Sequence, residues 1–186
     1  MGRLAGVLVV ALLAGCAAVR PEGDVVRVEA PAPPADGKVK VGQGYFDFTA
    51  RDLAGREVRL SSLVGPKVVL LQFWGIRCAP CLAEMDFLSD LQERLGPRGL
   101  QVIGVNTDRV DAGALARAMR ERGLEPSYPI VLDADFSISQ HYTNWLIPVT
   151  VLIDRRGVVR VIHTGYKPEL GEKIARDVAQ ALGRQE

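Results

Sequence analysis

Two cysteines separated by two residues, Cys78 and Cys81, are the part of this sequence with the clearest chemistry. They follow an apolar run, residues 68–74, that has the composition of a buried strand, and they precede a segment with a helical pattern. A thiol at the start of a helix lies at the positive end of the helix dipole, which stabilises a thiolate. A second thiol one turn later is close enough to close a disulfide. The spacing therefore predicts a pair that exchanges electrons at a strand-to-helix junction.

The position of each thiol predicts its role. Cys78, at the first helical position, is expected to be the nucleophile, and Arg77 adds a nearby positive charge. Together with the helix dipole, this charge is expected to lower the pKa of the Cys78 thiol below the value of about 8.5 for a free cysteine. Cys81 is expected to be less exposed and to attack the mixed disulfide that Cys78 forms with a partner. Pro80 fits the first helical turn because it forfeits no helix hydrogen bond there.

Glu84 lies three residues after the second cysteine and is a candidate proton carrier for Cys81. A carboxylate partly buried beside a thiol has a raised pKa, which suits it to accept the thiol proton. The alternative is an exposed glutamate in the first helical turn that only complements the helix dipole. Both interpretations remain open on the residues alone.

The remainder of the chain predicts the elements that position this pair. Strands are expected at 45–49, 57–60, 68–74, 100–106, 128–132, 149–154 and 158–162, and helical segments at 78–95, 111–122, 137–142 and 169–182. Asp111 is a candidate N-cap. The alternation of strands and helices predicts an α/β fold, with a mixed central sheet, helices on both faces and an N-terminal β-hairpin.

The N-terminus has the layout of an export signal. A basic start is followed by an apolar stretch at 4–13, about half the ~20 residues needed to span a bilayer. The sequence Leu-Ala-Gly-Cys at 13–16 resembles the bacterial lipobox, which implies lipidation of Cys16 and anchoring to a membrane. The alternative is an ordinary cleaved signal that contains a cysteine by chance.

Three segments are therefore expected along the chain. Residues 1–16 form a lipoprotein signal peptide, 17–41 form a flexible tether rich in Pro and Gly, and 42–186 form the folded domain. Apolar residues make up 48% of the chain, which is enough for a core. The formal charge of +1 gives no indication of nucleic-acid binding.

The segment Phe-Trp-Gly-Ile-Arg-Cys-Ala-Pro-Cys at 73–81 resembles the active site of thioredoxin-fold proteins. The wider similarity is to the TlpA/ResA-like (redoxin) branch of thiol-disulfide oxidoreductases. Residues 46–63 look like the N-terminal hairpin of that branch, Glu84 matches its active-site glutamate, and 147–154 match its cis-proline loop. The resemblance extends from about residue 42 to the C-terminus.

The resemblance also implies a substrate-binding surface. Pro148 is expected to be cis and to pack against the cysteine pair, which leaves the main chain of Ile147 to pair with an extended partner segment. Trp74 and Arg77 are expected on the rim of the site, where they contact partners, with plain core packing as the alternative for Trp74. Trp145 and Tyr142 are interpreted as core residues, with an apolar docking patch as the alternative.

The resemblance implies a function as well. Members of this branch are exported and membrane-tethered, and they often deliver electrons for cytochrome c maturation or to other exported proteins. The expected partners are disulfide-bearing exported proteins and an upstream membrane thiol donor, in the periplasm or an equivalent extracytoplasmic space. We expect a monomer that reduces these partners without a cofactor or metal.

Three departures and three rival functions accompany this interpretation. Gln72 replaces the buried aspartate of cytoplasmic thioredoxins, and Arg77 and Ala79 replace residues common among relatives.

A zinc site lacks the further ligands it needs. A thiol peroxidase of the peroxiredoxin kind needs Thr or Ser three residues before its cysteine, where this chain has Gly75. A copper chaperone of the same fold needs a distal histidine, for which His163 is the candidate.

Overall fold

The computed structural model describes residues 37–183. Its centre is a five-stranded mixed sheet with the strand order β5-β4-β3-β6-β7. Strands β3, β4 and β5 are parallel, whereas β6 is antiparallel to both β3 and β7. The strands are β3 (Val68–Trp74), β4 (Leu100–Asn106), β5 (Ile130–Leu132), β6 (Val149–Ile153) and β7 (Val159–Thr164).

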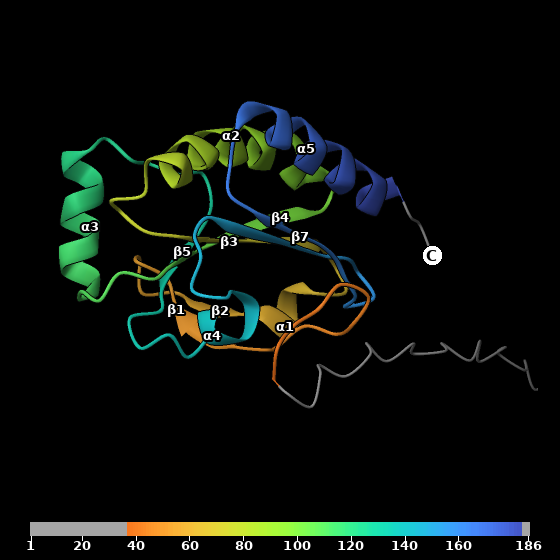
Figure 1. Ribbon diagram of the computed structural model, residues 1–186, viewed down its shortest axis with the longest axis horizontal. Coiled ribbons are helices and arrows are strands. Elements are labelled where there is room, and N and C mark those ends of the chain that lie inside the picture. The colour runs from red at the N-terminus through yellow and green to blue at the C-terminus, as the bar shows by residue number, and fades with distance from the viewer. Residues whose placement is uncertain (1–36, 184–186) are drawn as a thin grey trace, which may run out of the picture.

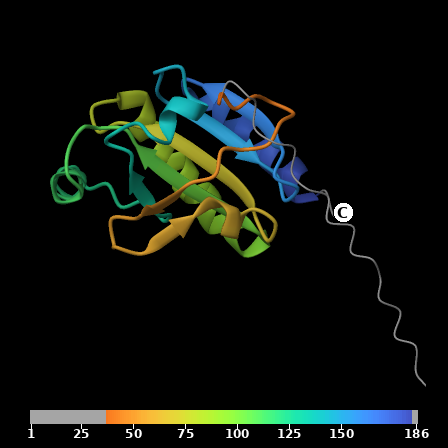
Figure 2. The same cartoon turned by 90° about the horizontal axis from the view of Figure 1, so that it is seen from below.

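Helices and a hairpin cover the two faces of this sheet. Helices α2 (Ala79–Leu95) and α5 (Pro168–Gly183) lie over one face (Figure 1). Helix α3 (Ala112–Glu121) adds Leu115 and Met119 to the same core. The other face carries the hairpin β1 (Thr49–Arg51) and β2 (Glu57–Arg59) with two short helices, α1 (Leu60–Leu63) and α4 (Ser139–Tyr142) (Figure 2). The predicted mixed sheet with helices on both faces and an N-terminal hairpin is confirmed.

Strand β3 lies at the centre of the sheet, and all seven of its residues are buried. Successive side chains of a strand point to opposite faces. Leu70 and Trp74 accordingly join the core under α2 and α5, whereas Leu71 and Phe73 join the core under the hairpin. Because the strand is buried on both faces, its sequence is a continuous apolar run rather than an alternating one.

Several predicted elements have the expected bounds. Asp111 caps α3 and accepts a hydrogen bond from the N–H of Ala114. Helix α5 buries Ile174 and Val178, which belong to its apolar stripe. A 3₁₀ turn, η1 (Gly96–Arg98), follows α2. The strand expected at 45–49 begins only at Thr49. Just before it, the Asp47 carboxylate accepts hydrogen bonds from the N–H groups of Phe48 and Ser61.

The boundary between tether and domain needs a correction. Val39, assigned to the tether, is 6% exposed and donates its N–H to the carbonyl of His141. The carbonyl of Gly37 also hydrogen-bonds Nδ1 of His141. Residues 37–41 therefore belong to the folded unit. The signal segment, Cys16 and the rest of the tether lie outside the described residues. Within residues 37–183, no helix has the length and apolar character needed to cross a membrane.

Candidate active site

Cys78 and Cys81 form a disulfide at the junction between β3 and α2, with the sulfurs 2.04 Å apart. Cys78 is the N-cap of α2, and its sulfur accepts a hydrogen bond from the N–H of Cys81 over 3.3 Å. Cys78 is half-buried, whereas Cys81 is fully buried. Pro80 occupies the first helical turn, as predicted. The two sulfurs are therefore unequal, because only one of them combines exposure with the positive end of the helix.

The turn before the cysteines is held by Asp108, which follows β4. Its Oδ2 accepts hydrogen bonds from the N–H of Ile76 over 2.7 Å and from the side chain of Asn106 over 2.8 Å. Asn106 lies beside Trp74 in the parallel register of β3 and β4. Asp108 was not among the site residues predicted from the sequence. The available signal was two polar residues at the carboxyl end of a strand parallel to β3.

Glu84 is fully buried one turn beyond Cys81, which excludes the alternative of an exposed glutamate. Its Oε1 accepts a hydrogen bond from the Thr150 hydroxyl over 2.7 Å, and its Oε2 accepts one from Nε2 of Gln72 over 3.0 Å. Burial raises the pKa of the Glu84 carboxyl to about 7, while the hydrogen bonds from Thr150 and Gln72 act in the opposite direction. At neutral pH this carboxyl can both accept and release a proton.

Thr150 and Gln72 reach Glu84 together because they lie directly opposite each other on β6 and β3. Gln72 also donates to the main-chain carbonyl of Cys81 over 3.1 Å and accepts a hydrogen bond from the Tyr128 hydroxyl over 3.0 Å. From the sequence, Gln72 was recognised only as a departure from thioredoxins, and Thr150 and Tyr128 were not among the predicted site residues. Thr150 had a signal in its position, since it follows Pro148 by two residues at the start of β6.

The proline loop lies at the same end of the sheet as the cysteines, where β3 ends and β6 begins. The Ile147–Pro148 peptide is cis, as predicted. Val149 pairs with Phe73, which places this loop beside the end of β3. Pro148 is buried, whereas Ile147 is 38% exposed. A Cβ built on Gly75 would lie 3.1 Å from Cδ1 of Ile147, so the Ile147 side chain packs against the turn before Cys78.

The predicted rim residues divide into two groups. Arg77 is exposed beside Cys78, as a contact residue must be. The substrate-binding prediction for Trp74 is wrong, because its side chain is 0% exposed under α2 and cannot touch a partner. Tyr142 is a core residue, as predicted. Trp145 is not a core residue, because it is 67% exposed.

Trp145, Leu146 and Ile147 form an exposed apolar segment directly before Pro148. The ring of Trp145 contacts Phe136 edge-on, with centroids 5.4 Å apart. Both of these residues have a φ of 62°, the left-handed region that bulky side chains rarely adopt. Unusual backbone of this kind clusters at functional sites.

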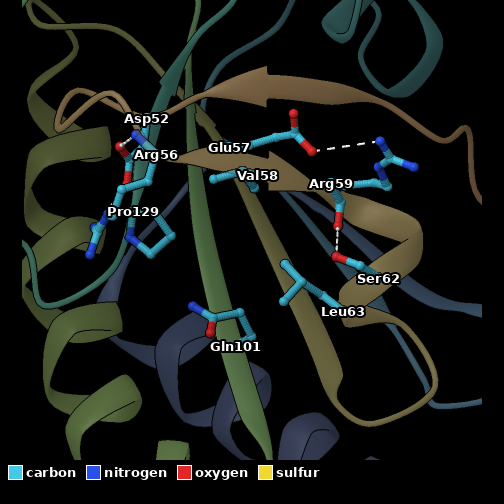
Figure 3. A pocket seen from close by; sticks show the side chains of 9 residues that line it. All are labelled: Asp52, Arg56, Glu57, Val58, Arg59, Ser62, Leu63, Gln101 and Pro129. Carbon is cyan, nitrogen blue, oxygen red and sulfur yellow. Dashed lines mark hydrogen bonds and ion pairs between the residues drawn. The ribbon is translucent and has the colours of Figure 1, made fainter.

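A hollow of about 270 Å³ lies elsewhere on the surface, between the hairpin and the edge of the sheet (Figure 3). Its lining includes the ion pairs Arg56–Asp52 and Arg59–Glu57. Arg56 is largely exposed, and Asp52 also accepts hydrogen bonds from the N–H groups of Ala54 and Arg56. These partners satisfy the charges of the hollow locally, and none of its lining residues belongs to the cysteine site.

The rival functions fit these residues poorly. His163 is hydrogen-bonded to Asp177 of α5 over 3.0 Å, and burial lowers its pKa. Its ring is thus engaged with a carboxylate rather than with the sulfurs. A threonine at Gly75, as the peroxidase would need, would bring its Cβ to 3.1 Å from Ile147 and 3.3 Å from Asp108. Within residues 37–183, no group of three or more His, Cys, Asp or Glu side chains has an arrangement that could hold a metal ion.

The comparisons with known proteins agree with this geometry. Residues 41–162 match the AhpC/TSA family. The thiol-disulfide oxidoreductase ResA of Halalkalibacterium halodurans is 32% identical over 130 residues, which cover 70% of this chain and 72% of that protein. ResA of Geobacillus kaustophilus is 37% identical over 127 residues, covering 68% and 71%.

Solved structures give the same assignment. A Chlorobium tepidum protein described as a thiol:disulfide interchange protein DsbE superposes with a TM-score of 0.71 at 28% identity, over 77% of this chain and 99% of that one. A secreted disulfide oxidoreductase of Mycobacterium tuberculosis, described as homologous to DsbE of E. coli, gives a TM-score of 0.58 at 25% identity, over 72% and 95%. The chain therefore belongs to the AhpC/TSA family and, within it, to the ResA-like thiol-disulfide oxidoreductases of thioredoxin-like fold.

Proposed function

We propose that this oxidoreductase works outside the cytosol, anchored to a bacterial membrane through Cys16, and reduces disulfides in exported proteins. The observation that carries the redox part of the proposal is the pairing of a half-buried Cys78 at the N-terminus of α2 with a buried Cys81 beside Glu84. Such an arrangement separates an attacking thiol from a resolving one. The resemblance to the TlpA/ResA-like branch supports the reducing direction, with cytochrome c maturation as one such pathway.

The first step begins from the reduced pair. The Cys78 thiolate attacks one sulfur of a partner disulfide, so that a Cys78–partner bond forms, the partner's S–S bond breaks and its other sulfur leaves as a thiolate. The hydrogen bond from the N–H of Cys81 and the N-terminus of α2 stabilise the Cys78 thiolate before the attack. Cys78 is half-buried at the start of α2, so a partner disulfide can reach its sulfur.

The second step releases the partner. The Cys81 thiol gives its proton to Glu84, and the resulting thiolate attacks the Cys78 sulfur. The Cys78–Cys81 bond forms and the Cys78–partner bond breaks, so the second partner sulfur also leaves as a thiolate. The partner has gained two electrons and becomes a dithiol when its two thiolates take up protons. Glu84 suits this transfer because burial raises its pKa to about 7, near the operating pH. An upstream thiol donor must then reduce the pair again.

A partner segment is expected to lie along Ile147 and Arg77. Within residues 37–183, no main-chain hydrogen bond joins Ile147 to another residue, and its side chain is 38% exposed beside the turn that precedes Cys78. An extended peptide can therefore pair with the Ile147 main chain, as in strand addition. Trp145 and Leu146 extend this surface with exposed apolar side chains.

The direction of electron flow is tested by the midpoint potential of the Cys78–Cys81 pair in a defined thiol buffer. For a reductant, the midpoint potential should be close to that of thioredoxin, which is about −270 mV. A midpoint potential of about −120 mV would reverse the proposed direction. The anchor is tested separately. Labelled fatty acid fed to cells should appear on the wild-type chain and not on the Cys16→Ser variant. A labelled Cys16→Ser chain, or an unlabelled wild type, would refute the anchor while leaving the redox chemistry intact.

A further inference from the structure

Gln72 is a fully buried side-chain amide that hydrogen-bonds three groups, two of them on α2 and one just before β5. Its Nε2 donates to the main-chain carbonyl of Cys81 over 3.1 Å and to Oε2 of Glu84 over 3.0 Å. Its Oε1 accepts from the hydroxyl of Tyr128, which is 6% exposed just before β5, over 3.0 Å. The nitrogen and the oxygen of the Gln72 amide thus make these three hydrogen bonds where the sheet meets α2.

These partners permit only one orientation of the amide. A flipped Gln72 would place its oxygen against the carbonyl of Cys81 and the carboxylate of Glu84, both of which are acceptors. The Tyr128 hydroxyl supplies the donor that the oxygen needs in the observed orientation. Burial, followed by the charge of Glu84, raises the pKa of Tyr128, so the hydroxyl stays protonated as a donor.

The neighbouring strand makes room for this contact. Gly104 lies directly beside Gln72 on β4. A Cβ at this position would lie 3.3 Å from Cε2 of Tyr128 and 2.4 Å from Cδ1 of Ile130. The absence of a side chain at Gly104 therefore lets the Tyr128 ring lie over the strand and reach Gln72.

We propose that Tyr128 and Gln72 are positioning residues for thiol exchange, which hold the Glu84 carboxylate and the Cys81 main chain in a fixed relation. This inference rests on the proposed role of Glu84 as proton acceptor. Tyr128 acts through Gln72 and does not touch either sulfur. Its hydrogen bond to the amide oxygen strengthens the Nε2–H as a donor, since linked hydrogen bonds polarise one another.

The hydrogen bond from Gln72, supported by Tyr128, favours the ionised form of Glu84, because a hydrogen bond to a charged group stabilises that charge. Among residues 37–183, Tyr128 and Tyr166 both feel the charges of Glu84 and Asp86, and His163 lies opposite Thr150 in the register of β6 and β7. In the oxidised protein the cysteines do not titrate. The Glu84 carboxyl can then be followed by its own carbon signal, separately from the imidazole of His163.

The test is a carbon-13 NMR titration of the Glu84 carboxyl in the oxidised protein. Tyr128→Phe removes one hydroxyl and is expected to raise the midpoint by about one pH unit, and Gln72→Leu by about one to two. Tyr142→Phe is the matched control, because its buried hydroxyl donates to the carbonyl of Phe46 on the other face of the sheet. The control is expected to leave the midpoint where the wild type has it.

A kinetic measurement separates this inference from the proposed role of Glu84. When the reduced protein reacts with DTNB, the second release of thionitrobenzoate reports the attack of Cys81 on the Cys78 adduct. Glu84→Gln should slow this phase and remove its dependence on a group near neutral pH, and Tyr128→Phe should shift that dependence upward only when Glu84 is present. An unchanged second phase in Glu84→Gln would overturn the role of Glu84. A clear Glu84→Gln effect, combined with unshifted carboxyl midpoints in both Tyr128→Phe and Gln72→Leu, would overturn the positioning role alone.

Discussion

The main-chain N–H of Cys81 points at the sulfur of Cys78 over 3.3 Å, within the pair that forms the disulfide. We expect the same N–H to face the Cys78 sulfur from the N-terminus of α2 when the pair is reduced. Cys81 has no comparable exposure, because its side chain is 0% accessible. This asymmetry supports the proposal that Cys78 attacks partners and Cys81 carries out the release step.

Unequal thiols predict unequal alkylation. We expect iodoacetamide at about pH 6.5 to label Cys78 in the reduced protein roughly tenfold faster than Cys81, because only a thiolate reacts and only Cys78 is both exposed and stabilised. Mass spectrometry of quenched samples measures both rates. Equal labelling, or faster labelling of Cys81, would contradict the assigned roles.

Glu84 predicts a pH-dependent stability. Its pKa rises from an ordinary 4.5 to about 7 in the folded protein, so the folded state holds a proton that the unfolded state has lost between these values. The contribution of Glu84 is therefore fully favourable below pH 4.5 and is lost as the pH rises towards 7, by about 3 kcal/mol in total. In urea unfolding of the oxidised protein, the free energy of unfolding of Glu84→Gln relative to the wild type should increase from pH 5 to pH 8. A difference that stays constant with pH would show that the carboxyl ionises normally.

We predict that Trp145 contributes more to partner binding than to the stability of the fold. Its left-handed backbone costs about 1–2 kcal/mol, whereas its edge-on contact with Phe136 contributes about 0.5–1.5 kcal/mol. Trp145→Gly should therefore change the melting temperature little while slowing the reduction of a protein disulfide such as insulin several-fold, and the DTNB reaction should be unaffected. Val41→Ala, which trims another exposed apolar residue, is the control. Equal insulin rates in wild type and Trp145→Gly would remove Trp145 from the docking surface.

Asp108 predicts a link between the turn before the cysteines and their reactivity. Asp108→Ala leaves the N–H of Ile76 and the amide of Asn106 without their acceptor, which should cost about 2 kcal/mol in unfolding free energy. It should also alter the rate at which Cys78 reacts with DTNB. Asp111→Ala removes the N-cap of α3 and should cost about 1 kcal/mol without changing that rate. Identical DTNB rates for the two variants would mean that Asp108 supports only the fold.

Local patterns in the sequence were sufficient to predict much of the fold. The apolar run of β3, the cap at Asp111 and the stripe of α5 each express a single periodicity or a single side-chain preference. The tether boundary was wrong because Val39 is one apolar residue in a stretch rich in Pro and Gly. Its burial depends on a contact with His141, about a hundred residues away in the chain.

The site divides in the same way. Cys78, Cys81 and the cis Pro148 belong to short motifs that can be recognised locally. Thr150 lies in the proline segment, whereas Tyr128 and Asp108 come from two other segments. The strand register is what brings these three residues close to the cysteine pair. Trp74 was placed on the rim because it precedes the motif directly. The alternation of β3 instead turns its side chain to the face that α2 covers, together with Gln72.

The most direct test of the redox assignment is covalent trapping of a disulfide partner by single-cysteine variants. Cys81→Ser removes the resolving thiol, so Cys78 should remain joined to its partner in an adduct that a strong reductant releases. Cys78→Ser, the matched control, should give no adduct because Cys81 is buried. Adducts with Cys81→Ser alone are the predicted result. Adducts with Cys78→Ser, or none with either variant together with no reduction of insulin by the wild type, would contradict it.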